Sequence, residues 1–264
     1  MPEGHTIHRL ARAVRGHLAG QELVVSSPQG RFAHGAARID GRVLDRVDAH
    51  GKHLFLGFGE EWVHVHLGLF GRVTVADGPA PAPRGAVRLR LVGADGYLDL
   101  RGPTACRLID EPTKQGLHDR LGADPLRRDA DPMQAFEKLR RRRLAMGAVL
   151  LDQSVVAGIG NVYRAELLHR AALSPHRDAR ALAEHEWVGL WDDTVRQLRA
   201  GARSGRIVTT EREHRDRPSG RARATDAHYV YKRAGLPCRR CGTAVRADEL
   251  AARTIFWCPS CQGR

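Results

Sequence analysis

The chain has 264 residues, with 43 Lys and Arg against 30 Asp and Glu, so its formal net charge is +13. A hydrophobic fraction of 42% can form a core, and no apolar run reaches the roughly 18 residues that a membrane span needs, which excludes a disordered chain and an integral membrane protein. The start carries an acid where a secretory signal would be basic, which predicts a cytoplasmic protein. Residues 196–240 hold 13 cations against four acids, and this local excess predicts a polyanionic partner.

The first segment, residues 1–112, is expected to be a helix followed by a β-sandwich or barrel. Apolar side chains recur at helical spacing from Ile7 to Leu18, and Gly20 follows as a stop. From there to about Asp110 apolar and polar residues alternate, with turn-forming residues between the runs. These two periods favour one N-terminal helix on an antiparallel β domain.

The rest of the chain is expected to form an all-α domain over residues 125–228 and a cysteine-bearing tail over residues 229–264. Asp131-Pro132 has the pattern of a helix cap with a first-turn proline, and apolar residues recur at helical spacing over residues 180–202. The polar, basic stretch over residues 204–227 lacks this periodicity and is predicted to be a loop.

Four of the five cysteines form two C-x2-C pairs with 16 residues between them: Cys238, Cys241, Cys258 and Cys261. Four thiolates close a tetrahedral zinc shell, so we expect one structural zinc ion on a β-hairpin finger. The alternative of two disulfides is disfavoured without an export signal. Cys106 is left over, and a lone thiol is more often an inert, buried side chain than a nucleophile.

The run Gly158-Ile159-Gly160-Asn161 has the pattern of a tight turn before a helix, with Asn161 as a suitable cap. The N-H groups and positive dipole end of such a helix suit a phosphate. By itself the pattern also fits a plain connection between two helices. The four arginines at residues 140–143 just upstream favour the phosphate interpretation, although such a run usually marks a solvated face.

The terminus offers an amine and an acid side by side. Methionine aminopeptidase removes Met1 before a small residue such as Pro2, and the secondary amine of Pro2 can then form an iminium with a sugar C1′ or an aldehyde. Glu3 is placed to move protons. The alternative is that Pro2 is only a processing signal and Glu3 a first-turn acid that the helix dipole favours. Lys52 follows Gly51 at a strand start, where a surface lysine is the default.

The chain resembles the formamidopyrimidine-DNA glycosylase and endonuclease VIII family of base-excision repair enzymes over essentially its whole length. The features that carry the resemblance follow one another in the family's order: the Pro-Glu terminus, the β-sandwich, the glycine turn and the finger. The resemblance implies a β-sandwich, a helix-two-turn-helix domain and a zinc-finger hairpin. It implies that Pro2 is the amine nucleophile, Glu3 the catalytic acid, and Lys52 a contact to the phosphate beside the lesion. It also implies that Asn161 grips DNA phosphate and that Arg253, in the finger hairpin, holds the backbone around the flipped nucleotide.

By this resemblance the protein is a bifunctional DNA glycosylase with abasic-site lyase activity. It would act on damaged DNA as a monomer, in the cytoplasm and associated with the nucleoid, and would evert the base before excising it. The rival is a zinc-ribbon DNA-binding protein without catalysis. That rival explains the charge, the finger and the glycine turn, but it leaves Pro2, Glu3 and Lys52 unexplained.

The sequence departs from the family pattern at the terminus and in the loops that fill the vacated duplex. Thr6 stands where members often have a second acid. Members specialised for 8-oxoguanine typically insert an arginine and a phenylalanine from a loop that here, over residues 102–106, has neither. Leu69 and Phe70 instead look like the leucine and aromatic of the Gln-Leu-Tyr wedge of endonuclease VIII, with Gly68 in place of the amide.

These loops predict the endonuclease VIII-like branch and a preference for oxidised pyrimidines. An apolar pair can unstack a base step, and without an arginine to contact the orphaned base we expect little dependence on that base. The alternative is that Leu69 and Phe70 are core residues of a strand, although consecutive strand residues face opposite ways.

Overall fold

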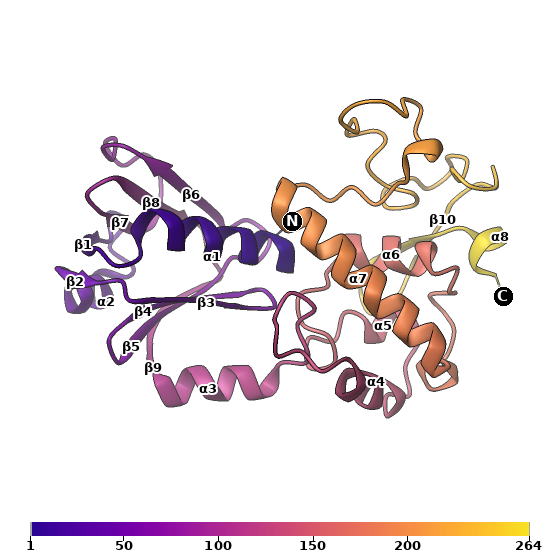
Figure 1. The fold of residues 1–264 in the computed structure, drawn as a ribbon, viewed down its shortest axis with the longest axis horizontal. Helices are drawn as coiled ribbons and strands as arrows, with labels where there is room; N and C mark the ends of the chain where they lie inside the picture. Colours follow the sequence, from indigo (N-terminus) through magenta and orange to yellow (C-terminus); the bar gives the residue numbers. More distant parts are fainter. Residues whose placement is uncertain (1, 264) are drawn as a thin grey trace. The chain divides into compact units, whose positions relative to one another are not determined.

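The computed structural model describes residues 2–263, and the chain divides into two compact units, Met1–Arg120 and Leu121–Arg264 (Figure 1). Met1, whose removal the sequence predicts, lies outside the described residues. Each unit has its own hydrophobic core.

The first unit is a two-sheet antiparallel sandwich that follows a helix, as the sequence predicts. One sheet has the order β2-β1-β7-β8-β6 and the other β3-β4-β5-β9. The strands of the first sheet are β1 (Glu22–Ser26), β2 (Arg42–Val43), β6 (Arg72–Asp77), β7 (Val87–Val92) and β8 (Gly96–Arg101). Those of the second are β3 (Arg46–His50), β4 (His53–Phe58), β5 (Glu61–His66) and β9 (Ala105–Asp110). The helices are α1 (Gly4–Leu18), α2 (Ala33–Ile39) and α3 (Glu111–Arg120).

Helix α1 joins the two sheets through one apolar face. Ile7, Val14 and Leu18 are fully buried on that face, one or two turns apart. The helix packs against β3 and β4 of one sheet and β6 and β8 of the other (Figure 1). The predicted helix and sandwich are therefore confirmed, and their shared core fixes where the start of the chain lies.

The second unit consists of helices with a small β-hairpin finger near its end. Its helices are α4 (Pro132–Arg140), α5 (Met146–Val149), α6 (Asn161–Arg170), α7 (Glu184–Ser204) and α8 (Pro259–Gln262), with 3-10 turns η1 (Ala179–Ala181) and η2 (Arg212–His214). The hairpin strands are β10 (Arg246–Glu249) and β11 (Thr254–Trp257). No helix in the part of the chain that the structure describes is long and apolar enough to cross a membrane.

Local signals set the helix ends in this unit. The Asp131 side chain accepts hydrogen bonds from the backbone N-H groups of Met133 (2.8 Å) and Gln134 (3.1 Å), which confirms the predicted cap of α4. Helix α7 ends at Gly205, whose φ of 72° is left-handed. The basic stretch that follows contains only the short turn η2, as its lack of periodicity predicts.

Candidate functional site

Pro2 and Glu3 stand directly before α1. Pro2 is half-buried, and Glu3 is fully buried at the N-cap position, where its carbonyl accepts from Thr6 N at 2.9 Å. The Glu3 carboxylate forms no capping hydrogen bond. Since Glu3 precedes the first turn and does not cap it, the alternative interpretation of Glu3 as a first-turn acid does not describe this residue.

The two residues after Gly4 form a polar pair. Thr6 Oγ1 lies 3.3 Å from His5 Nε2, within hydrogen-bond distance. Burial lowers the pKa of His5 to about 4. His5 is therefore neutral near pH 7 and adds no positive charge beside Pro2.

Lys52 lies in the tight turn that joins β3 to β4. His50 and His53 pair across this turn, and Gly51 adopts a left-handed φ of 58° that a two-residue hairpin turn requires. Lys52 is half-buried, and after burial it is the next cause that lowers the pKa of His66. The Lys52 ammonium and the His66 imidazole are therefore electrostatic neighbours at one end of the second sheet.

His64 and His66 share one face of β5, as their spacing indicates, and sequence reasoning missed that His53 of β4 joins them in a cluster. His53 Nδ1 lies 2.8 Å from His64 Nε2, and His53 stands opposite His66 in the sheet register. Burial, followed by neighbouring imidazoles and cations, lowers the pKa of His53 to about 3 and of His64 to about 4. Both rings are neutral near pH 7, so the positive charge near them comes from cations such as Lys52 and Arg107. Histidines on adjacent strands at even spacing are the signal that would have revealed the cluster.

Leu69 and Phe70 are exposed in the loop between β5 and β6. Their exposed fractions are 56% and 85%, so the alternative that they are core residues is wrong. Gly68 has a φ of 65°, and a Cβ there would lie 1.9 Å from Thr104 Oγ1 in the loop between β8 and β9. The close approach of the two loops therefore explains why position 68 carries no side chain.

Asn161 begins α6, but the N-cap position belongs to Gly160, one residue earlier than expected for the cap. The Asn161 side chain is only 9% exposed and is tied to the finger hairpin. Its Nδ2 donates to Thr254 O at 3.0 Å, and its Oδ1 accepts from Arg164 at 2.5 Å. Asn161 thus fixes the hairpin to the first turn of α6.

Arg164 and Glu166 are fully buried on α6, and sequence reasoning missed both. Arg164 donates to the carbonyls of Gly147 (3.2 Å), Leu250 (3.1 Å) and Thr254 (3.1 Å). It therefore connects α5, α6 and both ends of the hairpin turn through one guanidinium.

Glu166 holds the chain that enters the finger. Its carboxylate accepts from the backbone N-H groups of Tyr229 (2.7 Å), Val230 (2.9 Å) and Tyr231 (2.8 Å), and from the Thr209 hydroxyl. A buried carboxylate with this many donors is well satisfied. Helix α6 is thus the element on which the finger is mounted.

Arg253 is exposed next to the tip of the hairpin, and the tip itself is strained. Ala251 and Ala252 have φ of 56° and 55°, and Leu250 N donates to Arg253 O at 3.0 Å. Two successive left-handed residues make a tight turn that usually carries Asn or Gly, and each alanine there costs of order 1 to 2 kcal/mol. The anchor that Arg164 provides holds this turn in place.

The four cysteines fit one zinc ion. Their sulfur atoms lie within 4.8 Å of one another, with Cys238 and Cys261 3.9 Å apart and Cys241 and Cys258 3.5 Å apart. Tetrahedral zinc with bonds near 2.3 Å separates its sulfurs by about 3.8 Å. All four cysteines are free thiols, so the disulfide alternative is wrong.

A buried histidine completes the surroundings of the zinc site. His169 is fully buried, its ring stacks on Tyr229 with centroids 4.8 Å apart, and its Nε2 lies 3.4 Å from Cys238 Sγ. An N-H at Nε2 would stabilise thiolate charge on Cys238. Among residues 2–263 this cysteine cluster is the one group of three or more His, Cys, Asp or Glu side chains with metal-binding geometry.

The finger hairpin is expected to depend on its zinc ion. We expect Cys258→Ser, or treatment with a chelator, to unfold the hairpin that carries Arg253 and to weaken DNA binding at least about tenfold, because a small finger folds only around its ion. Metal analysis and a DNA-binding titration measure the two effects. Cys106→Ser is the matched control, since Cys106 packs on the core of the first unit, where burial raises the pKa of its thiol to about 12. Full DNA affinity in zinc-free protein would contradict the prediction.

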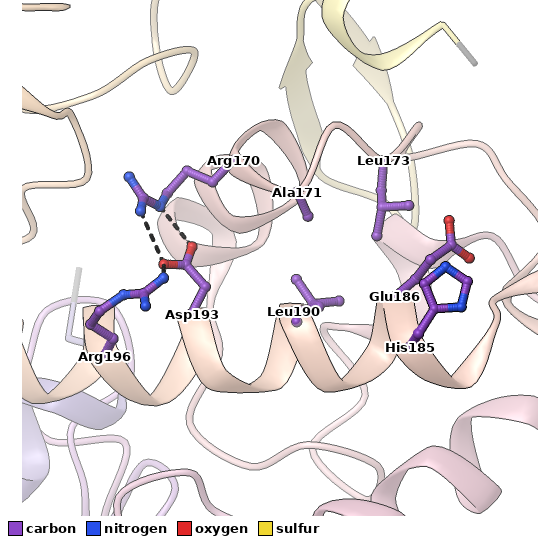
Figure 2. A pocket seen from close by; sticks show the side chains of 9 residues that line it. Arg170, Ala171, Leu173, His185, Glu186, Leu190, Asp193 and Arg196 are labelled. Carbon is purple, nitrogen blue, oxygen red and sulfur yellow. Dashed lines mark hydrogen bonds and ion pairs between the residues drawn. The ribbon is translucent and has the colours of Figure 1, made fainter.

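A hollow of about 350 Å³ beside α7 carries charges that neutralise one another. Figure 2 shows Arg170 and Arg196 both directed at Asp193, with Leu190 and Leu173 along the apolar part. Arg170 Nε lies 2.6 Å from Asp193 Oδ2, and Arg196 Nη2 lies 2.6 Å from Asp193 Oδ1. The pair of Arg170 and Asp193 holds α6 against α7, whereas Arg196 and Asp193 both belong to α7.

Three known domain families match successive parts of the chain. The formamidopyrimidine-DNA glycosylase N-terminal domain matches residues 1–106, the H2TH domain of that glycosylase matches residues 121–213, and the zinc finger found in FPG and IleRS matches residues 235–263. Endonuclease 8 1 of Mycobacterium tuberculosis is 48% identical over 267 residues, covering 99% of this chain and 100% of the relative. Formamidopyrimidine-DNA glycosylase of Laribacter hongkongensis is 32% identical over 276 residues, covering 99% and 100%.

A solved structure of MutM in complex with carbocyclic 8-oxo-G containing DNA has a TM-score of 0.80 at 24% identity and covers 100% of both chains. At this identity the likeness shows the fold, which agrees with the predicted order of helix and β-sandwich, helical domain and zinc finger. The family follows from the full-length relatives and the three domain matches. The chain is therefore a member of the formamidopyrimidine-DNA glycosylase and endonuclease VIII family, whose members are DNA-repair glycosylases.

Proposed function

We propose that the protein is a bifunctional glycosylase and abasic-site lyase that uses the N-terminal amine of Pro2. The observation that carries this proposal is the pair at the start of α1, where Pro2 is followed by a buried carboxylate that does not cap the helix. Lys52, half-buried in the tight turn between β3 and β4 of the same unit, would supply a cation for a neighbouring phosphate of the DNA. A DNA-binding protein without catalysis needs neither an N-terminal amine nor a buried carboxylate beside it.

In the proposed reaction, the neutral Pro2 nitrogen attacks C1′ of the damaged nucleotide. The bond from C1′ to the base breaks, and the base leaves with the electron pair and takes up a proton whose transfer Glu3 assists. The C1′–O4′ bond then breaks, O4′ takes up the proton that the Pro2 nitrogen releases, and an iminium forms between Pro2 and C1′. Loss of a C2′ proton then expels the 3′ phosphate, and a second elimination expels the 5′ phosphate. Hydrolysis of the iminium releases Pro2.

Phosphate and duplex contacts are assigned to the remaining residues. Lys52, Asn161 and Arg253 would position the backbone, and Leu69 and Phe70 would fill the space of the everted nucleotide. The exposure of Leu69 and Phe70 supports a wedge, and the exposure of Arg253 supports a backbone contact. The Asn161 side chain is engaged with Thr254, so its contribution is to fix the hairpin, while the N-terminus of α6 offers its N-H groups.

The proposed substrates are oxidised pyrimidines, with little dependence on the opposite base. The exposed apolar pair Leu69 and Phe70 favours the choice of oxidised pyrimidines. The loop over residues 102–106 has no arginine, so it cannot select the opposite base through a bidentate contact worth about 1 to 3 kcal/mol. The relatives named Endonuclease 8 at 48% identity support the same branch. We also propose that the enzyme acts on DNA of the nucleoid as a monomer.

The test is a panel of duplexes with single lesions, incubated with and without borohydride. We expect single-turnover excision of thymine glycol to be faster than that of 8-oxoguanine opposite cytosine, and borohydride to trap the protein on the abasic product. Faster excision of 8-oxoguanine would overturn the lesion preference alone. Binding to every duplex without base release or trapping would support the non-catalytic rival instead.

A further inference from the structure

A second hollow, of about 470 Å³, lies where α7 ends and the basic stretch begins. Its charged lining is entirely positive: Arg203, Arg206, Arg215 and Arg221. Small and apolar residues complete the lining: Ala200, Ser204, Val208 and Ala222. No carboxylate lines it, in contrast to the hollow of Figure 2, where Asp193 neutralises two arginines.

The acids of this stretch are paired with cations that do not line the hollow. Arg170 binds Glu211 at 2.8 Å, and Arg239 binds Asp216 at 3.1 Å and Asp226 at 3.2 Å. The remaining acid, Glu213, faces His214 at 3.9 Å. Within residues 2–263, no carboxylate forms an ion pair with Arg206, Arg215 or Arg221. The positive charge of these three arginines is therefore left for an external anion.

Two of the guanidinium groups are held in place by the chain itself. Arg206 Nη2 donates to Ala222 O at 2.9 Å. Arg215 Nε donates to Thr210 Oγ1 at 3.0 Å, and the buried Thr210 hydroxyl in turn donates to Asp226 O at 2.6 Å. Each of these arginines keeps further N-H donors, because a guanidinium carries five. Such preorganisation lowers the entropy lost when an anion binds.

The end of α7 opposes anion binding only weakly. A helix C-terminus carries roughly half a negative charge, whereas four guanidinium groups carry four positive charges that persist at any physiological pH. The apolar residues Val208 and Ala222 lower the local dielectric and so strengthen the attraction. The net potential in the hollow is positive.

We propose that this hollow is a phosphate-binding site in which Arg206 and Arg215 hold one phosphate group and Arg203 and Arg221 add charge at its edge. The phosphate can come from the backbone of bound DNA or from a free polyphosphate, because both present the same oxygens to the guanidinium groups. The DNA source deepens the proposed function by adding a backbone contact outside the residues assigned to chemistry.

The test compares two double variants. Arg206→Gln/Arg221→Gln removes one phosphate-holding arginine and one edge arginine from the hollow, and Arg217→Gln/Arg223→Gln removes the same charge from exposed positions on the same stretch that do not line it. Affinity for an undamaged duplex is measured against salt concentration, and binding of tripolyphosphate is measured by calorimetry. Zinc content and thermal midpoint check that both doubles are folded. Because no lesion is used, failure here is distinguishable from failure of the proposed chemistry.

If a DNA phosphate occupies the hollow, the first double lowers the slope of log affinity against log salt by about 0.9 and the control double leaves it unchanged. If tripolyphosphate binding is lost in the first double alone while the slope stays the same, the phosphate site stands and its source is a free polyphosphate. Equal changes in both doubles, or no change in either measurement, would overturn the proposal.

Discussion

Replacing Pro2 with glycine is expected to reduce borohydride trapping on abasic DNA at least about tenfold, equivalent to about 1.4 kcal/mol of activation free energy. Glycine still permits removal of Met1 and still presents an amine. However, it lacks the ring that holds the nitrogen in a fixed direction beside α1, so the attacking atom loses its orientation. DNA affinity should remain, because the amine contributes little to the charge of the whole protein.

The measurement is the rate of covalent trapping by gel, with mass spectrometry to establish that the wild type and the variant both lack Met1. Arg12→Gln is a suitable control, since Arg12 is exposed on the same helix, more than two turns from the terminus. Robust trapping by protein that retains Met1 would contradict the assignment of Pro2.

Glu166→Gln is expected to lower the free energy of unfolding of the second unit by about 3 kcal/mol. The carboxylate accepts three backbone N-H groups and one hydroxyl, and the side chain is fully buried. The amide that replaces it has one oxygen, and its NH2 group faces donors, so at least one buried N-H group loses its partner. Hydrogen bonds to a buried charge contribute about 1.5 to 3 kcal/mol each, and breaking such a set has a correspondingly large effect.

Urea unfolding followed by the fluorescence of Trp187 and Trp191, which are buried in the core of this unit, measures the change. The rate of zinc release to a chelator should rise in the same variant, because Glu166 fixes the chain that leads into the finger. Glu184→Gln is the matched control, since Glu184 is exposed in the first turn of α7. If the two variants unfold alike, the anchoring role of Glu166 is wrong.

The sequence was most informative where a local pattern determines structure. The helical spacing from Ile7 to Leu18, the alternation of the strands and the spacing of the cysteines each need only a few neighbouring residues. The cap at Asp131 is of the same kind, because its hydrogen bonds go to residues two and three positions later.

Residues whose partners lie far along the chain could not be predicted. A helix with Arg164 and Glu166 has the composition of a solvated surface, and only the tertiary structure brings carbonyls and N-H groups 63 to 90 positions away to these side chains. The role of Asn161 could not be predicted for the same reason, because its partner Thr254 is 93 positions away. The histidine cluster needs the register of β4 against β5, which the sequence leaves open.

The mounting of the finger on α6 also limits how this protein can recombine with its relatives. A cysteine-bearing segment that begins at Tyr229 has the outline of an exchangeable module, yet its entry depends on Glu166 and its hairpin turn on Arg164. A chimera whose recipient has no counterparts of Arg164 and Glu166 would inherit the cysteines without the groups that orient Arg253. Transfer of the finger to such a recipient has to carry part of α6 with it, so the transferable unit is the helix and the finger together.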